Sequence, residues 1–413
     1  MRVIIRPALS DAHIDANQNS SQRQLSLAIS AQGEPGRTLP LNLCLVLDHS
    51  GSMGGRPLET VKKAAIELVK QLNPEDRVSV IAFDHRAKVI VPNQGIEDLN
   101  TVIEQIKALR AAGGTAIDEG LKLGIKESAL GKQERVSQIF LLTDGENEHG
   151  DNERCLKLAQ VASDYNITLN TLGFGNHWNQ DVLEKIADSA GGSLSYIENP
   201  EKALEEFSRL FSRAQSIGLT NAHLIIDLLP QASLAQLKPI AQVEPETVEL
   251  TVQSEGTRHT VRLGDLMVDQ ERVVLINLYI NQLSPGIQTI GKAQVRFDDP
   301  ALSQTGILSE TIPLNVEVQT VYQPEPNDQV RQSILALAKY RQTQIAEEKL
   351  KQGDRIGAAT LLQTAAKTAL QLGDQGAATI LQSSATRLQM GEDLSEAERK
   401  KTRIVAKTRL QAD

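Results

Sequence analysis

Residues 41–52 read Leu-Asn-Leu-Cys-Leu-Val-Leu-Asp-His-Ser-Gly-Ser, and this stretch decides the fold. Its apolar run, 41–47, is too short for a typical helix and predicts a strand buried on both faces of a parallel sheet. Asp48 then stands at the carboxyl end of that strand, which is where open α/β sheets bind ligands. Together, Asp48, Ser50 and Ser52 offer one carboxylate and two hydroxyls at alternate positions, a set of oxygens that suits a hard divalent cation.

Two later segments are expected to return to the same sheet edge. Gly113-Gly114-Thr115 separates two amphipathic helical patterns, 96–109 and 116–130, so its glycines free the backbone while Thr115 presents a hydroxyl at a helix start. Thr143-Asp144-Gly145 ends the apolar run 139–142, which predicts a second buried strand. Asp144 therefore supplies a second carboxylate at the carboxyl end of a strand.

The motif Asp48-x-Ser50-x-Ser52, followed by Thr115 and Asp144 in this order, resembles the metal-ion-dependent adhesion site of von Willebrand factor A (vWA) domains. The resemblance covers residues 42–213, and the doubly wound α/β sheet of the family accounts for the alternation of strand and helix patterns there. It implies direct coordination by the three hydroxyls, with the two carboxylates acting partly through water. The implied cation is Mg²⁺, with Ca²⁺ or Mn²⁺ as alternatives, and its open position would take an Asp or Glu carboxylate of a partner protein.

Relatives that hold a second ion carry further acidic residues directly after the motif. Here residues 53–56 read Met-Gly-Gly-Arg, so one ion is expected. The side chain of His49 is expected to point away from the cation, because its neighbours in the motif point toward it.

Loops at the same edge are expected to form a partner-binding rim, made of Gly114, His149, His177 and Trp178. Trp178 is the chain's only tryptophan. It can be an anchor for the partner or a side chain packed beneath its own loop. His149 and His177 could instead hold a transition metal, but the three-His or Cys-His spacing of such sites is absent.

From residue 219 the hydrophobic period changes to two, with short alternating segments separated by Gly and Pro. This pattern predicts an antiparallel β-sandwich, which two similar segments near the amino terminus are expected to complete. Three helical stretches follow a Pro-rich break at 323–328 and predict a helical hairpin, with a solvated or disordered basic tail from Glu392. The expected organisation is N-terminal sandwich strands (1–38), a vWA domain (39–217), the β-sandwich (218–322) and a C-terminal helical region (327–413).

Composition excludes several classes of function. The formal net charge is -9 and only 3% of residues are aromatic, which argues against nucleic acid as a partner. The two cysteines give no disulfide framework, and no signal-like or 18-residue apolar stretch occurs. We therefore expect a cytoplasmic protein without a membrane span. The oligomeric state stays open.

The expected function is non-enzymatic, metal-dependent protein binding of an adhesion or scaffold type. A hydrolase using the same ion would need a general base and an activated water, and no Ser-His-Asp order or HExxH helix occurs. The alternative is an accessory subunit of a MoxR-type AAA+ ATPase or of a kinase and phosphatase stress-response system. In that case the ATPase activity would belong to another chain, because no Walker A motif is present.

Overall fold

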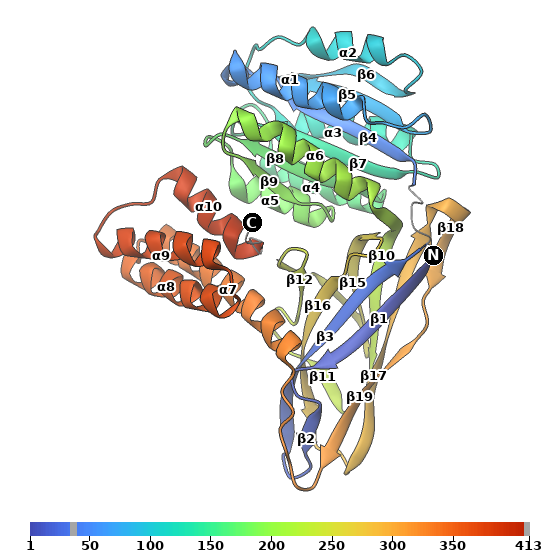
Figure 1. Ribbon diagram of the computed structural model, residues 1–413, viewed down its shortest axis with the longest axis vertical. Helices are drawn as coiled ribbons and strands as arrows, with labels where there is room; N and C mark the ends of the chain where they lie inside the picture. Colours follow the sequence, from blue (N-terminus) through green and yellow to red (C-terminus); the bar gives the residue numbers. More distant parts are fainter. Residues whose placement is uncertain (34–38, 409–413) are drawn as a thin grey trace.

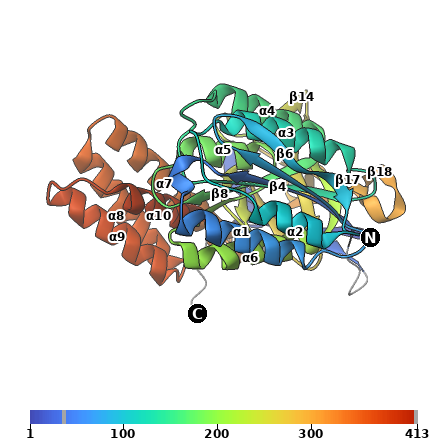
Figure 2. The ribbon, with the colours of Figure 1, turned by 90° about the horizontal axis from the view of Figure 1, so that it is seen from above.

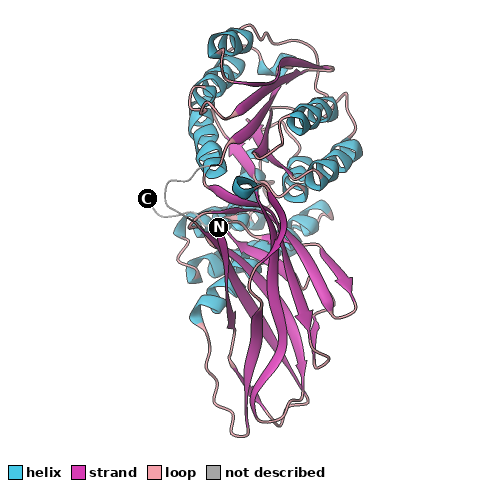
Figure 3. Ribbon diagram, turned by 90° about the vertical axis from the view of Figure 1, so that its right-hand side faces the viewer, coloured by secondary structure: helices cyan, strands magenta, loops and turns pink. Residues whose placement is uncertain are grey.

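The computed structural model describes residues 1–33 and 39–408. An α/β domain stands above a long β-sandwich, and a helical domain lies beside the junction of the two (Figures 1 and 3). The predicted boundary after residue 38 touches residues 34–38, which lie outside the described part, as do residues 409–413 of the predicted helical region. Within the described residues, no helix is both long and apolar enough to cross a membrane.

The α/β domain is built on a six-stranded sheet with the order β6-β5-β4-β7-β8-β9. Its strands are β4 (Leu41–Asp48), β5 (Arg77–Phe83), β6 (Ala87–Gly95), β7 (Val136–Thr143), β8 (Ile167–Phe174) and β9 (Leu194–Ile197). All neighbours pair in parallel except β5 and β6. The chain adds β5 to one side of β4 and β7 to the other, so the strand order reverses at the end of β4, and ligand sites of open sheets lie at such points.

Helices cover both faces of this sheet (Figure 2). They are α1 (Arg56–Val69), α2 (Leu99–Lys107), α3 (Ile117–Leu130), α4 (Asn152–Asp164), α5 (Gln180–Ser189) and α6 (Ala203–Gln215). Side chains alternate along β4: Leu43 and Leu45 pack with α1, α2 and α6, whereas Cys44 and Val46 pack with α3, α4 and α5. Burial on both faces explains why β4 is apolar at every position except Asn42 and the terminal Asp48.

The sandwich consists of two mostly antiparallel sheets around one apolar core. One sheet has β1 (Arg2–Leu9), β3 (Ser20–Gln32), β16 (Arg272–Asn281), β12 (Ile240–Glu244), β13 (Val248–Glu249) and β11 (Ala232–Leu234). The other has β14 (Val252–Glu255), β15 (Arg258–Met267), β10 (Ile217–Leu228), β17 (Gly286–Asp299), β18 (Gln304–Leu308), β19 (Ile312–Gln319) and β2 (His13–Asp15). The α/β domain is thus inserted between β3 and β10, and the amino-terminal strands pair with strands from the far side of the insertion.

The helical domain differs from the predicted hairpin and solvated tail. It contains α7 (Asp328–Lys351), α8 (Arg355–Gln371), α9 (Gln375–Gln389) and α10 (Glu396–Lys407). Instead of lying in solvent, α10 buries Lys400, Val405 and Lys407. Its basic side chains meet acidic residues of α5, with Lys407 Nζ 2.5 Å from Asp188 Oδ1. A charge run alone could not reveal this partner helix.

Candidate metal centre

Asp48 ends β4 at the predicted sheet edge and is fully buried. One carboxylate oxygen, Oδ1, accepts a hydrogen bond from the backbone N–H of Ser50 at 2.8 Å. The other, Oδ2, accepts from Thr143 Oγ1 at 2.6 Å. The carboxylate is therefore held in one orientation from two sides.

The two serines of the motif link this strand end to Asp144. Ser52 Oγ donates to Asp144 Oδ1 at 2.7 Å, and the hydroxyl oxygens of Ser50 and Ser52 lie 3.1 Å apart. Ser50 is buried, whereas Ser52 is exposed and Asp144 is partly buried. The oxygens thus form a cluster that opens to solvent on one side.

Thr115 reaches the same cluster because backbone hydrogen bonds tie its loop to the loop after β4. Gly51 N–H donates to Gly113 O at 2.9 Å, and Ala112 N–H donates to His49 O at 2.8 Å. A Cβ added to Gly145 would lie 3.2 Å from Thr115 Oγ1, so this hydroxyl lies directly beside the Thr-Asp-Gly turn. The structure therefore brings together Asp48, Ser50, Ser52, Thr115 and Asp144, the five residues predicted as metal ligands.

Glycine at position 113 makes this approach possible. Its φ is +73°, a conformation that side chains rarely adopt. A Cβ there would also lie 2.5 Å from His85 Nδ1. A larger residue at this position would therefore strain the backbone of the loop that carries Thr115.

The electrostatics of the cluster favour a bound cation. Burial raises the pKa of Asp48 to about 6, against the opposing effect of its hydrogen bonds from Thr143 and Ser50. Burial also raises the pKa of Asp144. Two carboxylates removed from water gain most from a nearby positive charge, and hydroxyl and carboxylate oxygens are the donors that Mg²⁺ and Ca²⁺ prefer. The residues present therefore fit a hard divalent cation.

Three of the four predicted rim residues lie beside this cluster or on its exposed loops. A Cβ on Gly114 would lie 2.3 Å from His149 Cε1, so the His149 ring lies directly over that glycine. His177 is exposed, and its charge acts on the pKa of Asp144. Within the described residues, no three His, Cys, Asp or Glu side chains gather as a metal cluster.

The ring of His49 is turned away from the oxygen cluster, as expected for the second residue of the motif. Its Nδ1 lies 2.9 Å from the backbone oxygen of Arg110.

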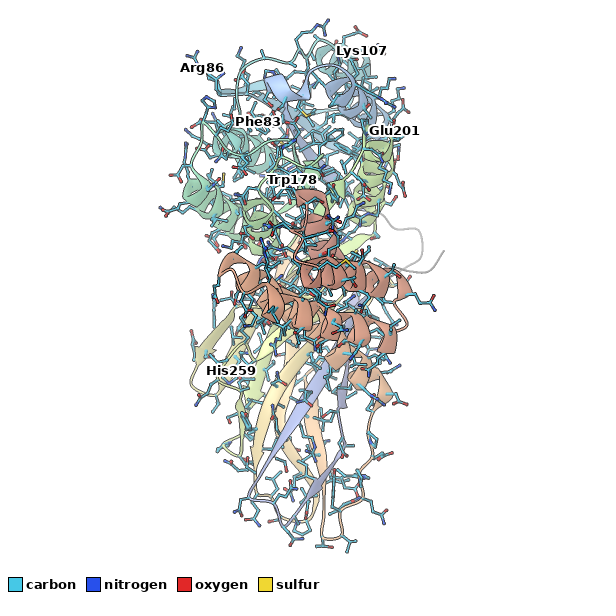
Figure 4. The ribbon with its side chains drawn as sticks, turned by 90° about the vertical axis from the view of Figure 1, so that its left-hand side faces the viewer. Phe83, Arg86, Lys107, Trp178, Glu201 and His259 are labelled. Carbon is cyan, nitrogen blue, oxygen red and sulfur yellow. The ribbon has the colours of Figure 1, made fainter. Side chains whose placement is uncertain are left out.

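Of the two alternatives for Trp178, the structure shows the one in which the side chain packs beneath its own loop, so this residue does not belong to the exposed rim. Its side chain is only 2% exposed, and its Nε1 donates to Gly175 O at 2.7 Å, so the ring packs under its own loop. Lys400 of α10 covers the ring, and Figure 4 shows the labelled Trp178 beside the C-terminal helices. An indole that is covered in this way cannot serve as an anchor for an external partner.

Two residues that hold this edge of the sheet in place, Thr143 and Lys400, are absent from the predicted site. The hydroxyl of Thr143 orients the Asp48 carboxylate. The sequence signal for this role is the position of Thr143 at the end of a buried strand. Lys400 had no local signal, because its partners are backbone oxygens 222 and 224 residues earlier in the chain.

Two parts of the chain match models of protein families. Residues 42–210 match the model of the von Willebrand factor type A domain, and residues 328–412 match the model of the Sll0103-like, C-terminal alpha-helical domain. The chain is 64% identical over 412 residues to the uncharacterized protein sll0103 of Synechocystis sp., an alignment that covers 100% of this chain and 98% of that protein. It is 31% identical over 180 residues to mouse inter alpha-trypsin inhibitor, heavy chain 4, covering 41% of this chain and 19% of that protein.

Two solved structures share the architecture along nearly the whole chain. The von Willebrand factor type A protein from Catenulispora acidiphila superimposes with a TM-score of 0.80 at 16% identity, covering 99% of this chain and 97% of that one. The ArnB paralog VWA2 from Sulfolobus acidocaldarius gives a TM-score of 0.59 at 16% identity, with 98% of each chain covered. At this identity the likeness establishes the fold alone.

Proposed function

This chain belongs to the Sll0103-like family of von Willebrand factor type A proteins, and on that premise we propose that it captures a partner protein through a divalent cation at the β4 edge. A vWA domain indicates protein–protein interaction or adhesion, and such domains commonly bind a divalent cation. The proposal adds that binding depends on the cation and that the partner offers an Asp or Glu side chain.

The observation that carries the proposal is the convergence of three hydroxyls and two carboxylates on one partly open cluster. A cation held mainly by neutral hydroxyls would keep positive charge for an incoming carboxylate. Mg²⁺ is the first candidate because it is commonly bound through one or two carboxylates with oxygens from elsewhere completing its shell. Exposed Ser52 lies on the open side, where a partner could reach the cluster.

We propose binding and not catalysis at this edge. A hydrolase would need a side chain free to accept a proton from water. Both oxygens of Asp48 already accept hydrogen bonds, and Asp144 accepts one from Ser52. The geometry thus supports holding a ligand better than activating a water molecule.

The test is affinity capture from native lysate followed by mass spectrometry, with wild type, Ser52→Ala and Asp48→Ala baits in Mg²⁺ or EDTA. Ser52→Ala is the cleaner variant because Ser52 is exposed, whereas Asp48→Ala leaves the buried Thr143 hydroxyl without its acceptor. We expect one set of proteins to be lost in EDTA and in both variants.

Glu67→Ala is the control, because it removes one carboxylate from the exposed face of α1, where Glu67 pairs with Lys70. It should retain every partner. Identical protein lists from wild type in Mg²⁺, wild type in EDTA and Ser52→Ala would overturn the proposal.

A further inference from the structure

A cavity of about 520 Å³ lies between the α/β domain and the sandwich. Asn166, just before β8, and Gly191, in the turn between α5 and β9, line it from above. The cation site lies at the carboxyl ends of the strands, whereas Asn166 precedes the amino end of β8. The cavity is therefore separate from the cation site and lies at the opposite edge of the sheet.

Three basic residues form one row across the sandwich wall of this cavity. His223 on β10 is paired in register with Arg262 on β15 and with Arg296 on β17, and all three line the cavity. Residues directly opposite each other in antiparallel strands project from the same face, with Cβ atoms about 5 Å apart. The two guanidinium groups of the row flank the imidazole, and no acidic side chain stands in register between them.

A second row on the same three strands shows how the sandwich compensates such charges elsewhere. Asp227 of β10 is paired in register with Arg258 and Lys292. Its Oδ1 lies 2.7 Å from Arg258 Nε, and its Oδ2 lies 3.7 Å from Lys292 Nζ. Asp227 in the middle of this row thus pairs with both flanking cations, whereas the row in the cavity has His223 in the middle position.

Within the row, His223 already has a partner, because its Nδ1 lies 2.9 Å from the backbone oxygen of Asn221. Arg262 and Arg296 make no hydrogen bond or ion pair with any residue in the described ranges 1–33 and 39–408. Of the acids that line the cavity, Asp164 accepts a hydrogen bond from Gln160. Against the larger effect of burial, Asp164 and Asp265 raise the pKa of Arg262 through their charge alone. The remaining acids of the lining are paired with other cations: Glu246 with Arg213, Glu249 with Arg341 and Asp188 with Lys407.

Arg262 also lies where the two domains meet. A Cβ added to Gly191 of the α/β domain would lie 2.8 Å from Arg262 Nη1, so the guanidinium group lies against the backbone of that domain. Burial lowers the pKa of Arg262 and of His223, whereas Arg296 at the other end of the row is exposed. A ligand bound to the row would therefore lie against both domains at Arg262 and reach the surface at Arg296.

We propose that this cavity binds a small molecule carrying a phosphate or carboxylate group, held by Arg262 and Arg296 with His223 between them. The anionic group takes the place that Asp227 occupies in the neighbouring row. Guanidinium groups bind both kinds of oxyanion through paired hydrogen bonds, and the volume is that of a small-molecule site. This site acts independently of the cation at the β4 edge.

The test is calorimetric titration of the full chain with inorganic phosphate and, separately, with succinate, in EDTA and at constant ionic strength. We expect saturable binding of at least one probe, and the preferred probe identifies the ligand class. The double variant Arg262→Gln/Arg296→Gln should bind that probe at least tenfold more weakly. Arg258→Gln is the matched control, because it removes a guanidinium from the compensated row, and it should bind as wild type does.

His223→Asp gives a second readout that needs no ligand. It copies the compensated row, so it should raise the melting temperature of the unliganded protein and abolish binding of both probes. The proposal is overturned if neither probe binds wild type, if the double variant binds as wild type does, or if His223→Asp lowers the melting temperature and leaves probe binding intact.

Discussion

The ammonium group of Lys400 on α10 lies 4.2 Å from the centroid of the Trp178 ring. It also donates hydrogen bonds to the backbone oxygens of Asn176 at 2.7 Å and of Trp178 at 2.9 Å. One residue of the helical domain thus fixes the loop that follows β8, at the edge of the sheet that carries the cation site. Because Trp178 is the only tryptophan, its fluorescence reports directly on whether α10 is docked.

Lys400→Met should loosen α10 from the α/β domain. The substitution leaves two backbone oxygens without their donor, which costs on the order of 1–3 kcal/mol for buried groups. We expect a red shift of tryptophan emission and faster hydrogen exchange in α10. Lys401→Met is the control, since Lys401 forms an exposed ion pair with Glu198, and such pairs contribute little. Equal spectra for wild type and Lys400→Met would contradict this role.

Docking of α10 should also weaken in acid through Asp181. Burial opposes ionisation of this carboxyl group, but Arg403 and Lys351 outweigh it and lower its pKa to about 2. Because this value lies below that of an unfolded Asp, about 3.9, the stabilisation is complete above about pH 4 and is lost as the pH falls toward 2. Tryptophan emission should follow this loss in wild type, whereas Asp181→Asn should start from a weaker docked state and lack this component. Superimposable titrations would refute the assignment.

Thr143→Val should weaken cation binding without removing a ligand. The change deletes the hydroxyl that donates to Asp48 Oδ2 and keeps the shape of the side chain. Loss of such supporting hydrogen bonds typically costs about 10- to 100-fold in metal affinity. Thr171→Val is the matched control, because its hydroxyl is buried on β8 and donates to Leu183 O. Calorimetry with Mg²⁺ that gives the same loss for both variants would assign the effect to general destabilisation.

Much of the fold follows from periodicity in the sequence. Apart from Asn42, the residues of the run 41–47 are apolar on both faces of the strand. A sheet that is covered by helices on both sides requires this pattern. Residues 247–252 also alternate in hydrophobicity, but in the structure they are divided between β13 and β14, which belong to different sheets. Alternation predicts strands but not the point at which a chain crosses from one sheet to the other.

The candidate site shows the same division between local and long-range information. Asp48, Ser50 and Ser52 could be identified because the cluster begins as a contiguous motif at a strand end. The burial of Trp178 depends on Lys400, which lies more than 200 residues later in the chain. No local sequence pattern predicts that contact. For the same reason the basic tail could not be distinguished from a solvated helix.

The most direct test of the central claim is a calorimetric titration of Mg²⁺ into metal-stripped wild type and Ser52→Ala protein. With few direct carboxylate ligands and an open position, wild type should bind one ion with a Kd on the order of 10⁻⁴ to 10⁻³ M. Ser52→Ala should bind it at least tenfold more weakly, with an unchanged melting temperature in EDTA. Absence of binding to wild type, or equal affinity of the two proteins, would contradict a cation site at the end of β4.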